Sequence, residues 1–239
     1  MVRAAALLAA LAVLGWYYAV SEGLPTLGLW SDVAFLSFGL LPLTFFLVLL
    51  ALPLRRAEMT QLAWAALSLV AVTVVLELAN LDIAANFVKI GAVVAVGWWF
   101  LAFFEALSWV LLIAVLIVPV DIFSVARGPT KEIVENQPQV FNALSISFPL
   151  PGEHNSAQLG LPDVLFFSLF LGAADRFGLR VRLTWLLMTL SFGATLALAV
   201  AFDISGLPAL PLLSVAFVTA NADHLWRYYG EWRAARASK

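Results

Sequence analysis

Cysteine is absent from this chain of 239 residues, histidine occurs only twice, and charged residues make up just 12% of it. Without cysteine the protein has no disulfide bond, no thiolate metal site and no cysteine nucleophile. His154 and His224 lie far apart, and neither a His-Glu-x-x-His zinc motif nor a Gly-x-Ser-x-Gly serine motif occurs. The net charge of -2 provides no basic field for nucleic acid. We therefore expect no metal, no cofactor and no nucleic-acid partner.

Hydrophobic residues, in contrast, make up 63% of the chain, well above their share in soluble domains. They gather in stretches of about 18 residues or more, the length that a helix needs to cross the hydrocarbon of a bilayer. We expect an all-α polytopic helix bundle, an integral membrane protein that crosses the lipid bilayer about eight times. The candidate spans are 3–20, 33–54, 60–79, 86–104, 106–126, 161–177, 182–202 and 207–226.

The spans leave no room for a soluble domain, so residues 1–239 are expected to form a single membrane domain. Its N-terminal helices occupy 1–104. A second group of helices occupies 105–226 and contains the longest loop, 127–159. The tail, 227–239, combines arginine with aromatic residues, which is typical of a cytoplasmic interfacial segment.

Basic residues indicate the orientation, because Lys and Arg are retained on the cytoplasmic side of a membrane. With the N-terminus inside, ten of them fall on the inner face and three, Lys89, Arg127 and Lys131, on the outer face. An even number of spans then puts both termini in the cytoplasm. Small size and the lack of a targeting signal favour a prokaryotic inner membrane. A competing interpretation treats Met1 to Val20 as a cleaved signal peptide, although no clear cleavage site follows this long apolar run.

Two aspartates fall inside predicted spans at the same depth. Asp121 precedes the outer end of the fifth span and Asp163 follows the outer start of the sixth, so both lie about 3 to 8 Å below the outer surface. A carboxylate at this depth costs a few kcal/mol and normally faces a partner or water. Two carboxyl groups within a few Å share a proton, and such a pair can hydrolyse a peptide bond without a metal. Helix capping and coupling-ion binding in a transporter explain the residues equally well.

Three short motifs follow one another along the second half of the chain: VDIFSVARGP at 120–129, LGLPD at 159–163 and LPALP at 207–211. In order and spacing they resemble the aromatic-Asp, Gly-x-Gly-Asp and Pro-Ala-Leu signatures of the presenilin and signal peptide peptidase family of intramembrane aspartyl proteases. The resemblance covers roughly residues 87–220 and implies a presenilin-like fold.

This resemblance implies an aspartic endopeptidase that hydrolyses peptide bonds within transmembrane segments, which would be its substrates. It implies that Asp121 and Asp163 form the catalytic pair. The neighbours of Asp163 and the third motif would support the active site or bind substrate. These residues are Gly160, Leu161, Pro162, Pro208, Ala209, Leu210 and Pro211.

Two positions depart from the family pattern: Val120 replaces an aromatic residue, and Pro162 replaces the second glycine. Proline is tolerated in the first turn of a helix, where its missing N–H has no intrahelical partner. Gly206 and the prolines of the third motif delay the last helix, and irregular backbone at this depth is expected to line a cavity. Two alternatives stay open: an inactive presenilin-like scaffold that binds transmembrane helices, and a proton-coupled transporter.

The loop 127–159 contains ALSISF at 143–148, which alternates apolar and polar residues with a period of two. The alternation predicts an edge strand close to Gly160 and Asp163. Such a strand could pair with an unwound segment of a substrate through main-chain hydrogen bonds. An ordinary loop strand is the alternative.

Overall fold

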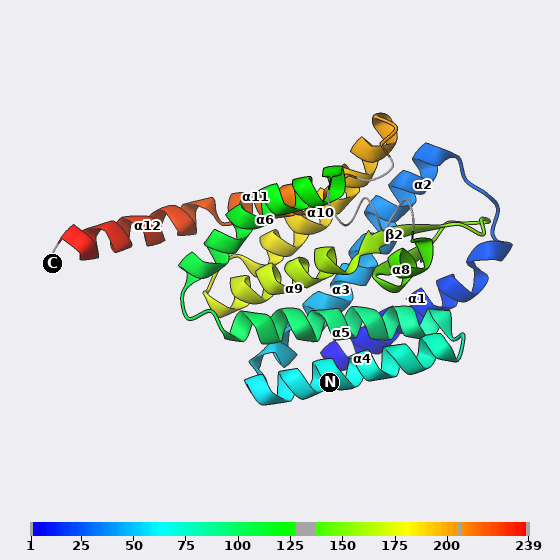
Figure 1. Cartoon of the computed structure of the whole chain (residues 1–239), viewed down its shortest axis with the longest axis horizontal. Coiled ribbons are helices and arrows are strands. Elements are labelled where there is room, and N and C mark those ends of the chain that lie inside the picture. Colours follow the sequence, from blue (N-terminus) through cyan, green and yellow to red (C-terminus); the bar gives the residue numbers. More distant parts are fainter. Residues whose placement is uncertain (1, 128–136, 205–206, 238–239) are drawn as a thin grey trace.

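Helices account for most of the residues that the computed structural model describes, which are 2–127, 137–204 and 207–237, and one β-hairpin interrupts them (Figure 1). Lys131 and Gly206 lie outside the described residues. The strands are β1 (Ser145–Pro149) and β2 (Ser156–Gly160). The helices are α1 (Val2–Val20), α2 (Leu29–Phe35), α3 (Leu41–Ala51), α4 (Met59–Leu78), α5 (Asp82–Ala102), α6 (Leu107–Arg127), α8 (Pro138–Ala143), α9 (Leu161–Arg176), α10 (Val181–Ala201), α11 (Leu210–Ala220) and α12 (Ala222–Ala237).

Six helical segments of the described chain are long and apolar enough to cross a membrane, which confirms a multi-pass membrane bundle. They coincide with the first five predicted spans and the seventh. The second passes from α2 through a π-helical turn, Leu36–Leu40, into α3. The six segments are Val2–Gly23, Leu29–Arg56, Met59–Leu78, Asp82–Ala102, Leu107–Arg127 and Val181–Ala201.

The other two predicted spans, 161–177 and 207–226, are occupied by α9, which matches its span to within one residue, and by α11, which is much shorter than predicted. α9 has 16 residues and α11 has 11, or about 24 and 16 Å of helix. α9 is followed by a turn in which Gly178 has a φ of 66°. α11 ends before Asn221, whose side chain accepts a hydrogen bond from the Arg180 N–H at 2.9 Å. Both helices have fewer than the 18 residues of a full span, so length confirms six of the eight expected spans.

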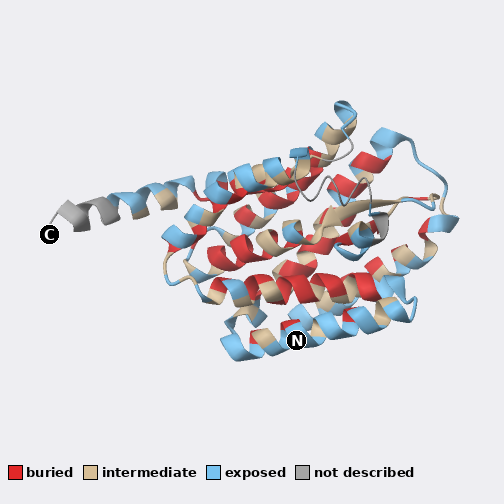
Figure 2. Ribbon diagram, in the orientation of Figure 1, coloured by how far each residue is buried: buried red, intermediate tan, exposed pale blue. Residues whose placement is uncertain are grey.

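The centre of the bundle is α9, in which every residue from Phe167 to Ala174 is buried (Figure 2). α5 lies against it, and the Trp98 indole N–H donates to the Ser168 carbonyl at 3.1 Å. A Cβ atom on Gly97 would lie 2.8 Å from the Leu165 carbonyl oxygen, so glycine permits this close approach. α4, in contrast, is mostly exposed and faces outward. Surrounding helices therefore hold α9, and with it Asp163, in place.

Basic and acidic residues pair at the end of the bundle that carries α12. Arg55 and Arg56 both form ion pairs with Asp175 at the end of α9. On the neighbouring helices Arg180 pairs with Asp223 at 2.6 Å. The charge distribution predicts a common inner face for these helix ends, and the ion pairs join them as that topology requires.

The hairpin lies at the opposite end of the bundle and leads directly into α9 (Figure 1). Its strands are antiparallel, with Ser145 opposite Gly160 and Phe148 opposite Ala157. The strand expected at 143–148 is confirmed as β1. Its partner β2 has the sequence SAQLG, which lacks the alternation of a half-buried strand and was not expected.

Side chains of α1 and α5 close the outer edge of β1. Asn86 accepts a hydrogen bond from the Ser147 N–H at 2.9 Å and donates to the Ser147 carbonyl at 3.0 Å. Tyr18 donates to the same carbonyl, and Tyr17 donates to the Pro149 carbonyl. β1 therefore pairs with β2 on one side and with side chains on the other.

Gly152, in the turn of the hairpin, should be a sensitive position for stability. It has a φ of 71°, and a Cβ atom there would lie 2.6 Å from the backbone nitrogen of Thr26. We expect Gly152→Ala to lower the free energy of unfolding by about 1–3 kcal/mol, measured by unfolding in detergent. Gly178→Ala is the matched control, because its φ of 66° is similar but no atom lies within 4 Å of the added Cβ. If both variants lost the same free energy of unfolding, the steric clash at Gly152 would not contribute to the effect.

Candidate active site

A cavity of about 1390 Å³ opens between α5, α6, α9, α10 and the hairpin. Its wall contains seven of the nine residues that the sequence predicts for the site. These are Asp121, Gly160, Leu161, Pro162, Asp163, Pro208 and Ala209. Leu210 and Pro211 lie just behind this lining, in the first turn of α11. Segments that are up to 90 residues apart in the sequence thus meet at one site, as the three motifs predict.

Asp121 projects from α6 toward the start of α11. One of its carboxylate oxygens, Oδ2, accepts a hydrogen bond from the Leu210 N–H at 3.1 Å. This N–H is available because the first N–H groups of a helix have no intrahelical acceptor. The Pro-Ala-Leu-Pro segment therefore supplies a backbone donor to the first aspartate.

Asp163 lies in the first turn of α9, directly after the hairpin. Pro162 is the second residue of this helix, where it removes no intrahelical hydrogen bond, as expected. The Leu161 N–H donates to the Leu144 carbonyl at 3.0 Å and so joins the start of α9 to the hairpin. The Asp163 carboxylate lies close to Gly160, because a Cβ atom on that glycine would be 3.2 Å from Asp163 Oδ2. The hairpin and the helix start together fix this carboxylate.

The two carboxyl groups line the same cavity. Val120 is 63% exposed and is not part of the cavity wall. Valine instead of an aromatic residue at this position therefore changes no side chain that lines the cavity. The chemistry available here is that of two carboxyl groups in a largely apolar cleft.

Sequence reasoning missed most of the apolar wall. Much of it comes from α5 and α10, neither of which carries a motif. Phe192 and Leu196 of α10 and Trp99 of α5 are examples. Gln158 of β2 is a polar member of the wall, and its side chain accepts hydrogen bonds from Ser145 and Ser147.

Within the described ranges, no three His, Asp or Glu side chains are grouped as a metal site would need. Comparison of the chain with protein-family models finds no match, and comparison with curated proteins finds none either.

Gly160 should matter for the position of Asp163. A Cβ atom at this residue would lie 3.2 Å from Asp163 Oδ2, while its φ of -60° and ψ of 142° suit any residue. We expect Gly160→Ala to shift the carboxylate by a few tenths of an ångström and to reduce the activity of the site about 10-fold, with little loss of stability. Gly28→Ala is the control, because Gly28 also precedes a helix with extended backbone but has open space around it. Unchanged activity of Gly160→Ala would contradict the steric argument.

Proposed function

We propose that the protein is an intramembrane aspartic endopeptidase that hydrolyses peptide bonds within transmembrane segments, with Asp121 and Asp163 as its catalytic pair. The observation that carries this proposal is the hydrogen bond from the Leu210 N–H to Asp121, in a cavity that Asp163 also lines. This hydrogen bond joins the first motif, which contains Asp121, to the third motif, which contains Leu210, beside the Asp163 of the second motif. A presenilin-like arrangement of the three motifs requires this meeting.

In the proposed reaction, one ionised carboxylate takes a proton from a water molecule, whose oxygen bonds to the carbonyl carbon of the scissile peptide. The other carboxyl group, which is protonated, gives its proton to the carbonyl oxygen, so that a gem-diol forms without a covalent enzyme intermediate. The first carboxyl group then protonates the nitrogen, the carbon–nitrogen bond breaks, and one hydroxyl of the diol returns a proton to the second carboxylate. An acid and an amine leave, and the pair again holds one proton.

We propose that the substrate unwinds and lies along β2. A transmembrane helix keeps its carbonyl groups in hydrogen bonds, so cleavage needs an extended segment. The register of the hairpin directs the backbone groups of Ser156, Gln158 and Gly160 away from β1. Among the described residues, none donates to the Gln158 carbonyl on this edge or accepts from its N–H. Strand addition here would lead a substrate toward Asp163. This replaces the expected pairing with β1, whose outer edge is closed.

We further propose that α9 and α11 are the two shorter membrane-embedded helices of an eight-helix topology. Both termini would then be cytoplasmic and the cavity would open in the outer half of the bilayer. A prokaryotic inner membrane is the proposed location.

Cleavage of a labelled transmembrane peptide by the purified protein in liposomes tests the proposal. In water enriched in oxygen-18, mass spectrometry should find two fragments, with one heavy oxygen in the new carboxyl group. Binding without cleavage would support the inactive scaffold, for which Pro162 is the specific observation. If the Pro162→Gly variant cleaved the peptide and the wild-type protein did not, this result would further support the inactive scaffold. Proton-coupled solute flux without cleavage would support the transporter.

A further inference from the structure

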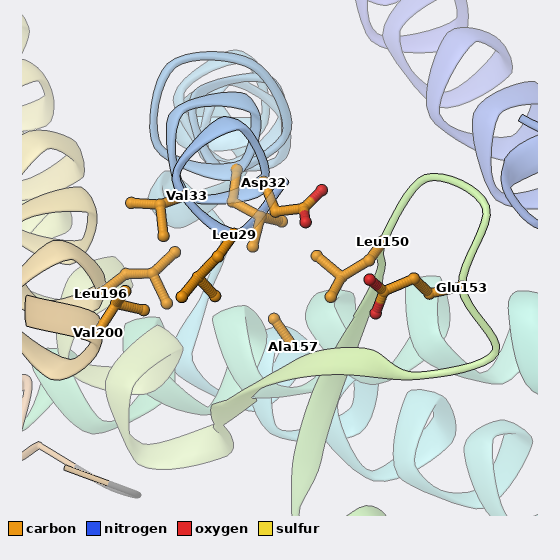
Figure 3. A pocket seen from close by; sticks show the side chains of 9 residues that line it. Leu29, Asp32, Val33, Leu150, Glu153, Ala157, Leu196 and Val200 are labelled. Carbon is orange, nitrogen blue, oxygen red and sulfur yellow. The ribbon is translucent and has the colours of Figure 1, made fainter. Parts of the chain in front are cut away.

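A second pocket, of about 220 Å³, lies at the hairpin end of the bundle, apart from the two catalytic aspartates (Figure 3). α2, α10 and the turn of the hairpin enclose it. Most of its lining is aliphatic, including Leu29, Val33, Leu196 and Val200. Two carboxylates, Asp32 and Glu153, are the exceptions.

Asp32 is an unusual residue for such a place. It is only 6% exposed, and its Oδ1 atom is buried without a hydrogen-bond partner among the described residues. Figure 3 shows its carboxyl group on the hairpin side of the pocket, where Glu153 lies. A buried carboxylate oxygen without a partner costs about 1–3 kcal/mol or more, so a donor that enters the pocket would relieve this cost. A cationic donor would also satisfy the charge of both residues.

The pocket adjoins the catalytic cavity. Leu36, Ala157 and Leu196 belong to the walls of both. Ala157 lies on β2, three residues before Gly160, or about 10 Å along the strand. A segment that extends along β2 from the catalytic pair would therefore pass the mouth of this pocket three to five residues from the cleaved bond.

We propose that this pocket binds a lysine side chain of the substrate, three to five residues from the scissile bond on the outer side. A lysine has a four-carbon stem that can lie against aliphatic walls and a compact ammonium group that can donate to both carboxylates. The planar fork of arginine matches a paired acceptor, whereas Asp32 and Glu153 come from different elements. A calcium ion takes six to eight oxygen ligands, and two carboxylates among aliphatic side chains do not supply them. The inference rests on the proposed function.

The test measures KM and kcat for transmembrane peptides in phosphatidylcholine liposomes, with a single lysine moved along positions two to eight from the cleaved bond. A second series carries norleucine, which keeps the aliphatic stem without the charge. At the best position, wild-type KM should be about 10-fold lower for lysine than for norleucine. The ratio of KM for the norleucine peptide to KM for the lysine peptide should fall to about 1 in Asp32→Asn. In Glu153→Gln this ratio should lie between 1 and the wild-type value.

Glu22→Gln is the matched control, because Glu22 is an exposed carboxylate at the same end of the bundle, paired with His154 at 3.7 Å. It should keep the wild-type ratio. Equal KM for lysine and norleucine at every position, or the same ratio in wild type and Asp32→Asn, would overturn the proposal while leaving the protease intact. Phosphatidylethanolamine also carries a primary ammonium, so the series is repeated with this lipid. If phosphatidylethanolamine abolishes the preference for lysine, the pocket binds the lipid headgroup and not the substrate.

A peptide-binding titration of the Asp163→Asn variant, by fluorescence in the same liposomes, separates this inference from the proposed function. If the wild-type protein cleaves no peptide, the proposed protease function is wrong. Tighter binding of lysine than of norleucine peptides, lost when Asp32→Asn is added, would still support the pocket. Equal binding of the two peptides would overturn it.

Discussion

Asparagine in place of Asp121 or of Asp163 should reduce the rate of peptide cleavage by about 100-fold or more. Asparagine has nearly the shape of aspartate, but it can neither take a proton from water nor give one to the substrate. The proposed mechanism requires both carboxyl groups together, so the double variant should be no slower than either single variant. Initial rates in liposomes measure the loss, and peptide binding shows that the cavity persists.

Asp82→Asn is the control for this pair. Asp82 is an exposed carboxylate at the start of α5, and it is not part of the cavity wall. Its variant should cleave at the wild-type rate. If either Asp121→Asn or Asp163→Asn cleaved peptides at the wild-type rate, the two aspartates would not be the catalytic pair, even if the protein is a protease.

Removing Asp175 should have the largest effect on stability. Its side chain is 18% exposed and pairs with Arg55, which is 13% exposed, so alanine at position 175 leaves a largely buried guanidinium group without its partner. We expect a loss of about 3–5 kcal/mol in the free energy of unfolding. Thermal and denaturant unfolding in detergent measure it.

The chain offers a matched pair for comparison. Asp223 binds Arg180 at 2.6 Å, but these side chains are 46% and 48% exposed, so Asp223→Ala should lower the stability much less than Asp175→Ala does. Arg55→Met combined with Asp175→Leu should recover most of the loss, because two apolar side chains need no partner. Similar losses for Asp175→Ala and Asp223→Ala would contradict the role of burial.

Hydropathy predicted the helices well because a membrane span must satisfy its own backbone, and a long apolar run has no other solution. It predicted the bounds of α9 to within one residue, but it predicted the length of α11 poorly. The end of α11 is set by local contacts, such as those of Asn221 with Arg180 and Thr184, which have no hydropathy signal. β2 escaped prediction for a similar reason. Its strand conformation depends on β1 and not on the residues SAQLG.

In the candidate site, too, some features could be predicted from the sequence and others depend on packing. The aspartates could be singled out because a carboxylate is expensive within an apolar span. The Pro-Ala-Leu-Pro segment could be singled out by its resemblance to a family motif. That the Leu210 N–H would point at Asp121 could not be predicted, since it depends on how α6 and α11 pack. That Asp32 is buried could not be predicted either. Its burial follows from the hairpin and α10, which lie more than 100 residues away.

The asymmetry of the hairpin has a consequence for stoichiometry. Asn86, Tyr17 and Tyr18 occupy the backbone groups on one edge of the sheet, which leaves the edge of β2 as the place where an extended segment can add. One such segment fills it. Any two peptides that unwind onto the sheet must therefore exclude each other, so each should act as a purely competitive inhibitor of the other's cleavage.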